Sequence, residues 1–489
     1  MFLKNVTTYV GTNLVSQIAS VAREFVIRAL IPPYLLGVWT MSMVVHDFAN
    51  TFEIGIIPAA FRELPILDGA NDRLEEMRVR STTFWSRIAQ GLLLGAGIIV
   101  YTVVYRGKYD RLQLFALGTA AFLVILTSIN ESFLSFFQAA QKYVSLSKLL
   151  LVFSLWQAIT LPVGAAVGGV TGLIVAYALS FTVQAALLCW IGSRESLRIE
   201  KAWEWSRFKR LLSYGLPLRV VDYPLQIFPM LDLLLIGRYL GVGPLAIYAT
   251  ARAVLTQGQE IISRIGSVML TRMFNLSGAQ AERAYLAEEL KRFLMVNYLV
   301  TIPIIIVGGN LGVGLLVPYL LPKYAAAVGV VRILLFALFF TPQTTLLRNF
   351  WMLDKNLIAV GISNVVGFAG ITASLIVARL TTGFRLETIA FAMVAGYSIY
   401  SLYVIFSIGR EVWGTARTLN FMCYLALSVL YTSVVIFMIG GREPGKDLAS
   451  AFQTMAAMIV YSLLLIAPLV FVGLWKSGSL AYLRENKQL

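Results

Sequence analysis

Residues 23–40 read REFVIRALIPPYLLGVWT, and residues 232–249 read DLLLIGRYLGVGPLAIYA. When the two stretches are aligned, Leu36 falls on Leu245 and Trp39 falls on Tyr248. Both stretches are mostly apolar and are interrupted by Gly and Pro residues. A weak internal match between apolar stretches far apart in the chain indicates a membrane protein built from two structural repeats.

The composition of the whole chain agrees with a membrane location. Of the 489 residues, 58% are hydrophobic and 13% are charged, and the mean hydropathy is +0.77. Soluble domains have about 45–50% apolar and about 25% charged residues. A disordered chain, a secreted disulfide scaffold and an ordinary cytosolic enzyme are therefore excluded. Because open sheet edges leave polar backbone groups unsatisfied in lipid, we expect an all-α polytopic membrane protein.

The apolar segments predict about 14 transmembrane helices. The expected spans are 5–31, 34–59, 84–105, 112–137, 146–166, 169–192, 212–237, 243–271, 293–317, 325–348, 357–379, 387–409, 419–440 and 450–474. Six spans separate the two repeats, an even number, so both repeats have the same orientation. We therefore expect two parallel six-helix lobes, 1–207 and 208–415. Residues 416–489 add helices 13 and 14 and a cytoplasmic tail.

The basic residues predict the orientation of these helices. Of the Lys and Arg residues assigned to connections, 25 fall in one alternating set, which includes both termini, and nine in the other. Cytoplasmic loops carry the excess of basic residues, so we expect a multi-pass protein with both termini in the cytoplasm. The net charge of +15 thus reports topology, and no nucleic-acid partner is expected.

Metal, redox and cofactor chemistry are not expected. The two cysteines, Cys189 and Cys423, lie inside apolar runs, which argues against a disulfide framework or a Cys-based metal site. The sequence has one histidine and no dense cluster of carboxylates. We therefore predict no catalytic residue, no metal site and no cofactor. One connection, 193–211, combines Trp, Phe and basic residues, and it is expected to be either a short amphipathic helix in the headgroup region or a plain basic linker.

Charged residues inside the spans point to a polar interior. Six arginines that are not counted with the connections fall there: Arg23, Arg28, Arg219, Arg252, Arg264 and Arg332. An Arg at the membrane centre costs about 2.5–3.5 kcal/mol on an insertion scale, so these residues should face a protein interior or a wet cavity. Because Arg suits bidentate contacts with phosphate, we infer a cavity that receives an anionic, phosphorylated group.

Further polar residues share helix faces with these arginines. At helical spacing, Glu24 precedes Arg28 by four residues and Glu260 precedes Arg264 by four. The polar residues that we expect at a central cleft between the lobes are Glu24, His46, Asp47, Glu53, Asp222 and Glu260.

Simpler interpretations of the same residues stay open. In each of the two Glu–Arg pairs, the Glu and the Arg lie four residues apart on one helix, and their charges can neutralise each other. Arg28, Arg264 and Arg332 can extend to a membrane interface, and His46 can be a structural hydrogen-bonding residue instead of a proton carrier.

Three stretches carry a resemblance to a known family. They are residues 232–249, the segment FFQAAQKY from residue 136 and the segment AFREL from residue 60. Together they resemble the polysaccharide-flippase (Wzx-type) branch of the multidrug/oligosaccharidyl-lipid/polysaccharide exporter superfamily. The resemblance extends from the first to the last expected helix.

The resemblance implies a non-enzymatic transporter of a bacterial or archaeal inner membrane. Its substrate would be a polyprenyl-diphosphate-linked oligosaccharide, moved from the cytoplasmic to the outer leaflet by alternating access. Membrane lipids and a glycan polymerase or glycosyltransferases would be its partners. The family's cavity arginines would correspond to Arg23, Arg28, Arg219, Arg252 and Arg264, and Glu24, Asp47 and Glu53 would be candidates for ion coupling.

Two other functions stay open on the sequence alone. One is a multidrug exporter of the same superfamily, which usually has twelve helices and acidic cavity residues. The other is a membrane glycan polymerase or glycosyltransferase, which often carries a large extracytoplasmic loop. The excess of Arg argues against the first, and the short expected loops argue against the second.

Overall fold

The computed structural model describes residues 16, 19–69, 72–140, 142–278, 283–306, 321–341, 343, 344, 347, 348, 351 and 357–440. Within this part of the chain, all regular elements are helices. Residues 19–30 are helical, and the elements that follow are α2 (Pro33–Thr51), α3 (Ile56–Gly69), α4 (Arg73–Val104), η1 (Arg106–Lys108), α5 (Arg111–Ala139), α6 (Tyr143–Arg194), α7 (Trp205–Tyr239), α8 (Val242–Gly278), α9 (Arg283–Ile306), η3 (Pro322–Tyr324), α11 (Ala327–Leu334), η4 (Leu335–Phe339), α13 (Leu357–Thr381), α14 (Leu386–Val412) and α15 (Thr415–Gly440).

Seven of the described helices are long and apolar enough to cross a membrane. The predicted class, an all-α polytopic membrane protein, is confirmed. The expected span 450–474, the start of the first span, the end of the ninth and part of the tenth lie outside the described residues.

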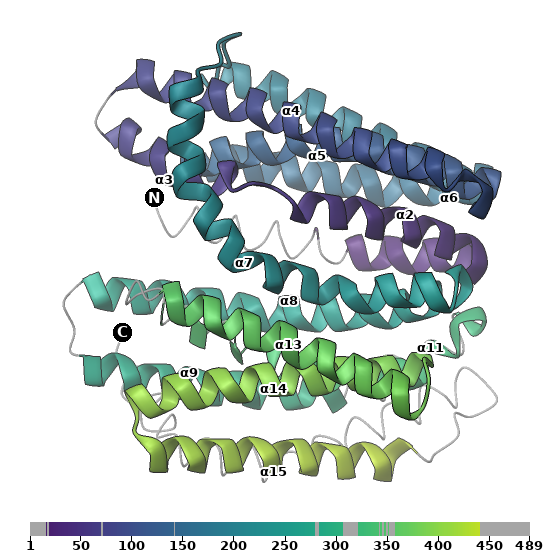
Figure 1. Ribbon diagram of the computed structural model, residues 1–489, viewed down its shortest axis with the longest axis vertical. Coiled ribbons are helices and arrows are strands. Elements are labelled where there is room, and N and C mark those ends of the chain that lie inside the picture. Colours follow the sequence, from purple (N-terminus) through teal and green to yellow (C-terminus); the bar gives the residue numbers. More distant parts are fainter. Residues whose placement is uncertain are drawn as a thin grey trace. The chain divides into compact units, whose positions relative to one another are not determined.

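The chain divides into two compact units. Unit 1 contains the chain up to Met230 and Gly241–Ala246, and unit 2 contains Leu231–Leu240 and the chain from Ile247 onward. In unit 1, α4, α5 and α6 lie side by side (Figure 1). Aromatic side chains of α5, including Phe133 and Phe137, fill the core where α3, α4 and α6 meet. In unit 2, α13 packs on α14, and α14 packs on α15 (Figure 1).

The second expected span, 34–59, was predicted too long. Helix α2 ends at Thr51, and a short break precedes α3. Gly55 has a φ of +86° within the break, a conformation that glycine adopts without steric cost. A Cβ atom on Gly55 would lie 2.1 Å from the backbone oxygen of Gly215 in α7. The chain therefore needs glycine at the point where α7 crosses the break.

Helix α4 begins eleven residues before the expected start at residue 84. Asp72 caps it, because the Asp72 side chain accepts a hydrogen bond of 3.1 Å from the backbone N–H of Glu75. Acidic residues in a first turn also interact favourably with the helix dipole. Hydropathy therefore located the apolar part of this helix but not its charged first turns.

Helix α6 contains the fifth and sixth expected spans. Gly169 interrupts it with a φ of +58°, and the hydroxyl groups of Thr160 and Ser180 lie 3.2 Å apart across this turn. The chain therefore reverses direction near Gly169. The predicted boundary between the spans 146–166 and 169–192 falls at this turn.

The connection 193–211 does not form a separate amphipathic helix. Helix α6 ends at Arg194, and α7 begins at Trp205 and continues as one helix through Pro217, Pro224 and Pro229. The residues between the two helices are not helical. Their backbone groups are instead hydrogen-bonded by side chains of α4, as described below.

Candidate functional site

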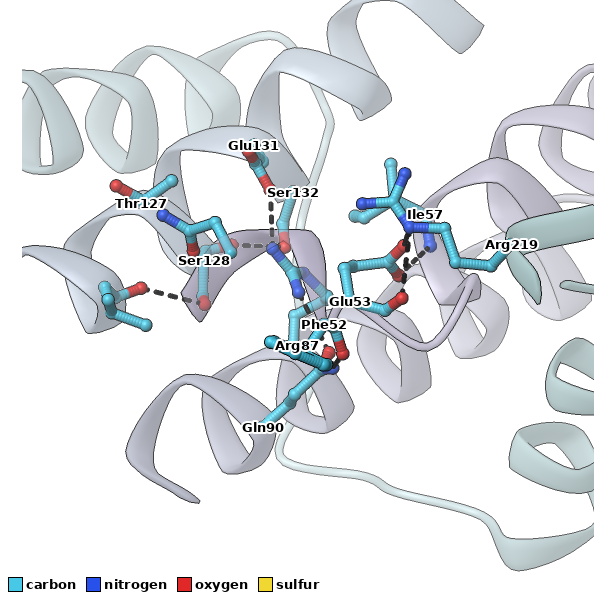
Figure 2. Close-up of polar contacts among 12 residues, drawn as sticks. Phe52, Glu53, Ile57, Arg87, Gln90, Thr127, Ser128, Glu131, Ser132 and Arg219 are labelled. Carbon is cyan, nitrogen blue, oxygen red and sulfur yellow. Dashed lines mark hydrogen bonds and ion pairs between the residues drawn. The ribbon is translucent and has the colours of Figure 1, made fainter. Parts of the chain in front are cut away.

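Glu53 ties the break between α2 and α3 to helix α7. Its side chain is only 5% exposed and lies 3.4 Å from Nε of Arg219. One carboxylate oxygen accepts a hydrogen bond of 3.2 Å from the backbone N–H of Ile57. The Glu53 carbonyl accepts two more, from Arg219 Nε and from the hydroxyl of Tyr223, each at 3.1 Å. Figure 2 shows Arg219 approaching Glu53 from α7.

A second ion pair joins α4 to α5. The Arg87 side chain is fully buried, and its Nη2 lies 2.5 Å from Oε2 of Glu131. Its Nη1 donates a hydrogen bond of 2.9 Å to Gln90, whose amide donates one of 2.8 Å to the carbonyl of Phe52. Phe52 precedes Glu53, so a chain of polar contacts runs from α5 through α4 to the helix break (Figure 2).

A cavity of about 460 Å³ opens beside these two ion pairs. Arg219 contacts Glu53 through Nε, and Figure 2 shows its two terminal nitrogens pointing away from Glu53. The cavity combines charged, polar and apolar side chains, so it suits an amphipathic ligand that carries an anionic group. Its lining residues are Glu53, Ile57, Pro58, Phe61, Glu131, Leu134, Ser135, Gln138 and Arg219.

The first helix of unit 1 carries a separate cluster of charges. Nη1 of Arg23 donates a hydrogen bond of 2.7 Å to Gln157 of α6, and its Nη2 donates one of 3.1 Å to Ser20. The Glu24 carboxylate lies between two guanidinium groups: one oxygen is 3.3 Å from Arg23, and the other contacts Arg28. Glu24 and Arg28, which lie four residues apart, therefore form the ion pair that the sequence allowed but did not decide.

In unit 2, Arg252 forms an ion pair with a fully buried carboxylate. Nη1 of Arg252 lies 2.9 Å from Oδ2 of Asp232, and the hydroxyl of Tyr248 donates a hydrogen bond of 2.9 Å to the same oxygen. Burial of a carboxylate is expensive unless it is paired and hydrogen-bonded. Arg252 thus holds together α7 and α8, the two helices that open the expected second lobe.

His46 belongs to a hydrogen-bonded group in α2 and α5. Its Nδ1 lies 2.8 Å from the Asp47 carboxylate, and its Nε2 lies 2.9 Å from the hydroxyl of Thr127 and 3.1 Å from the amide of Asn50. The His46 side chain is buried, whereas that of Asp47 is exposed. Both ring nitrogens of His46 therefore have partners.

The remaining candidates are spread along the chain. Asp222 lies one turn after Arg219 in α7, Glu260 is exposed in α8, and Arg332 lies in the last turn of α11. The side chain of Arg264 lies outside the described part of the structure. The predicted residues that the structure brings together are thus Arg219 with Glu53, Arg23 with Glu24 and Arg28, and His46 with Asp47.

The ion pair between Arg87 and Glu131 was not expected from the sequence. Arg87 was counted with the connections although it falls inside the expected span 84–105, and this count is wrong, because Arg87 lies inside α4 and is fully buried. The count of 25 connection residues therefore includes at least one interior cation. The available signal was the position of Glu131 inside the fourth expected span, since an acid at membrane depth requires a partner.

Comparison with known proteins identifies the family. Residues 25–311, more than half of the chain, match the family model described as polysaccharide biosynthesis protein. The chain belongs to this family. This polysaccharide biosynthesis protein is also 22% identical over 312 residues to a putative O-antigen transporter of Shigella flexneri, an alignment that covers 61% of this chain and 71% of that protein.

Solved structures with the same fold are transporters. The lipid II flippase MurJ in an inward closed conformation has a TM-score of 0.67 and 15% identity, covering 94% of this chain and 99% of that one. An inward-facing multidrug resistance MATE family transporter of the MOP superfamily has a TM-score of 0.61 and 15% identity, covering 82% and 96%. The resemblance that the sequence motifs indicated is confirmed for the family and its fold.

Proposed function

We propose that this protein is a flippase that moves a polyprenyl-diphosphate-linked oligosaccharide from the cytoplasmic to the outer leaflet of the inner membrane. Membership of the polysaccharide biosynthesis family and the similarity to an O-antigen transporter support this substrate class. The structural observation that carries the proposal is Arg219, a cation on the wall of a cavity of about 460 Å³ in a membrane-spanning protein.

The chemistry of the substrate matches this cavity. A diphosphate accepts charge-assisted hydrogen bonds from the terminal nitrogens of a guanidinium group, and those of Arg219 point away from Glu53 (Figure 2). Sugar hydroxyl groups can exchange hydrogen bonds with Ser135 and Gln138 of the lining. The polyprenyl chain stays in the bilayer, where it is soluble. The transfer forms and breaks no covalent bond.

Of the five candidate cations, we assign the first contact with substrate to Arg219. Arg23, Arg28 and Arg252 are held by carboxylates or amides of their own units. Release of the anion on the outer side would be assisted by the inside-negative potential, at about 2.3 kcal/mol per charge per 100 mV. Glu24, Asp47 and Glu53 stay candidates for ion coupling, and glycan-assembly enzymes stay candidate partners.

Multidrug export is the second candidate function. It is favoured by the MATE-like fold and by the two carboxylates in the cavity lining, which could attract a cationic drug. Both carboxylates lie within ion-pair distance of an arginine, Glu53 with Arg219 and Glu131 with Arg87. The two ion pairs therefore carry no net charge. Because the terminal nitrogens of Arg219 point away from Glu53, the cavity favours an anionic ligand over a cationic drug.

Leaflet transfer in proteoliposomes tests the proposal. The reconstituted protein should transfer a fluorescent polyprenyl-diphosphate oligosaccharide, should not transport cationic dyes and should make no new glycosidic bond. We expect Arg219→Ala to lower the transfer rate at least about tenfold, because it removes a charge-assisted hydrogen bond. Arg219→Lys should retain part of the rate.

Two further variants separate function from folding. Arg219→Ala alone leaves the buried Glu53 carboxylate without its cation, so the double variant Glu53→Gln/Arg219→Ala serves as the stable version. Arg194→Ala removes an exposed arginine that lies over Trp190, and it should transfer at the wild-type rate. Wild-type transfer by the folded double variant would remove Arg219 from the site, and dye transport without glycan transfer would replace the proposed function with drug export.

A further inference from the structure

The segment between α6 and α7, residues 195–204, lies along helix α4. Arg80 donates a hydrogen bond of 3.1 Å to the carbonyl of Ser196, and the indole of Trp85 donates one of 2.8 Å to the carbonyl of Glu200. The backbone N–H of Glu200 donates to Ser81 at 2.8 Å. These contacts satisfy backbone groups that a helix would otherwise satisfy, so the segment is held in place without being helical.

Three aromatic rings gather where this segment joins α7. The ring centroids of Trp203 and Trp205 are 5.8 Å apart, and Phe208 lies 5.7 Å from Trp203 and 5.3 Å from Trp205. The indole N–H of Trp203 donates a hydrogen bond of 2.8 Å to Ser86. The two tryptophans are nevertheless 47% and 56% exposed. Such rings, with an apolar body and a polar edge, are enriched at membrane–water interfaces.

Exposed cations lie close to the rings in the sequence. Nζ of Lys209 lies 5.8 Å from the centroid of the Trp205 ring, within the range of a cation–π interaction. Lys201 is also exposed and lies two positions before Trp203, so their Cα atoms are at most about 7.6 Å apart. Arg198, five residues before Trp203, is exposed as well.

The neighbouring acids are largely occupied by other arginines. Glu75 of α4 lies 2.5 Å from Arg207 and 3.1 Å from Arg210. Glu204 also contacts Arg207. Glu200 is the remaining exposed acid of the segment, against the three exposed cations. The surface around the aromatic rings therefore has a net positive charge.

We propose that Trp203, Trp205, Phe208, Lys201 and Lys209 form a binding site for the headgroup of an anionic phospholipid. The rings would lie at the depth of the headgroups and the upper acyl chains, and the two lysines would contact the phosphodiester and the anionic headgroup. In the expected topology this end of α4 and α7 lies at the cytoplasmic leaflet, which carries the anionic lipids. The site does not depend on which substrate the cavity binds.

Lipid retention by the full-length protein tests this site. The protein is reconstituted in nanodiscs that contain equal amounts of phosphatidylglycerol and phosphatidylcholine, released into mild detergent, and analysed by native mass spectrometry. We expect wild-type protein to retain phosphatidylglycerol preferentially. Lys201→Gln and Lys209→Gln should each lower this preference about fivefold, because one basic residue near an anionic membrane contributes about 1 kcal/mol.

Matched variants distinguish this site from general attraction. Nζ of Lys108 lies 4.8 Å from the ring of Tyr105, beyond the other end of α4, so Lys108→Gln removes the same kind of contact there and should leave the preference unchanged. Trp205→Ala should lower retention of both lipids. Equal loss in Lys108→Gln, or an unchanged preference in the double variant Lys201→Gln/Lys209→Gln, would overturn the proposal. Lipid retention needs no transport substrate, so its failure leaves the flippase proposal standing.

Discussion

The two side chains of the ion pair between Arg87 and Glu131 differ in how deeply they are buried. The Arg87 side chain is fully buried, whereas that of Glu131 is 44% exposed. Removing one partner of a buried pair leaves the other charge uncompensated, and the penalty grows with burial. We expect Glu131→Gln to destabilise the protein by about 2 kcal/mol and Arg87→Gln by clearly less, since the Glu131 carboxylate can take up water.

Thermal unfolding of the purified protein in detergent measures this difference. The double variant Arg87→Gln/Glu131→Gln removes both charges and serves as the control, and its Tm should exceed that of Glu131→Gln. Equal Tm values for the two single variants would show that another group compensates the charge of Arg87 when Glu131 is replaced.

The charged residues of the site could be predicted from the sequence only in part. The arginines inside expected spans were found because their charge conflicts with an apolar surrounding, and Arg219 and Glu53 were both among the candidates. Their mutual contact was not predicted, because 166 residues separate them and helical spacing relates only residues on one helix. Arg87 was missed because it lies at the point in α4 where the charged first turns are followed by the apolar part of the helix.

At the scale of helices, the crossing of α7 over the α2–α3 break depends on two small residues. A Cβ atom on Gly215 would lie 1.9 Å from the backbone oxygen of Gly55. We expect Gly215→Ala to force the two elements apart and to cost about 1–3 kcal/mol, as overpacking does. It should also lower transport, because Arg219 lies one turn further along α7.

Gly97 provides the matched control for this variant. It also lies in a helix, α4, but a Cβ atom there would meet nothing within 4 Å. Gly97→Ala should therefore leave Tm unchanged or raise it slightly, since Ala has a higher helix propensity than Gly. Equal effects of the two substitutions on Tm would contradict a tight crossing at Gly215.

The two ends of α6 are joined by a pH-sensitive contact. Nζ of Lys142 lies 2.9 Å from the Glu195 carboxylate, and this hydrogen bond lowers the pKa of Glu195 below its usual value of 4.5. Because the folded pKa is the lower one, the contact stabilises the protein fully above about pH 4.5 and is lost as the pH falls through the lowered pKa.

We therefore expect the Tm difference between wild type and Glu195→Gln to be constant near neutral pH and to close below about pH 4.5. Unfolding scans at a series of pH values measure it. In a Lys142→Gln background, Glu195→Gln should change Tm much less. A difference that persists at the lowest pH would show that the charge of Glu195 is not involved.

Helix positions were predicted better than helix ends. The turn at Gly169 coincides with the start of the expected span 169–192. The break at Gly55 was missed, because the apolar run continues through it and the deciding contact, with Gly215, comes from a distant helix. The early start of α4 was missed because hydropathy detects lipid contact and not helicity.

At the scale of the whole molecule, the excess of basic residues in alternating loops predicts that both termini lie in the cytoplasm. A green fluorescent protein fused after Leu489 should therefore fluoresce, and alkaline phosphatase fused there should be inactive. Fusions in the connection 106–111 should give the opposite pair of results. An active phosphatase at the C-terminus would place this terminus outside the cytoplasm and contradict the predicted topology.

The helical architecture of the molecule was largely predictable, whereas the full lining of the cavity beside Glu53 was not. Hydropathy and the family motifs indicated a polytopic helical membrane fold, and the fold that the chain shares with MurJ confirms it. The two six-helix lobes, 1–207 and 208–415, stay a prediction. The cavity beside Glu53 was not foreseen, because its lining comes from three separate stretches of sequence.

The burial of Arg87 has a consequence for biogenesis. While α4 enters the bilayer alone, the guanidinium group of Arg87 has no carboxylate partner, and its cost is at most the value of about 2.5–3.5 kcal/mol for an Arg at the membrane centre. The compensating Glu131 lies in α5 and is synthesised 44 residues later. The insertion machinery should therefore hold α4 until α5 emerges from the ribosome, and release the two as a helical hairpin whose charges are already neutralised.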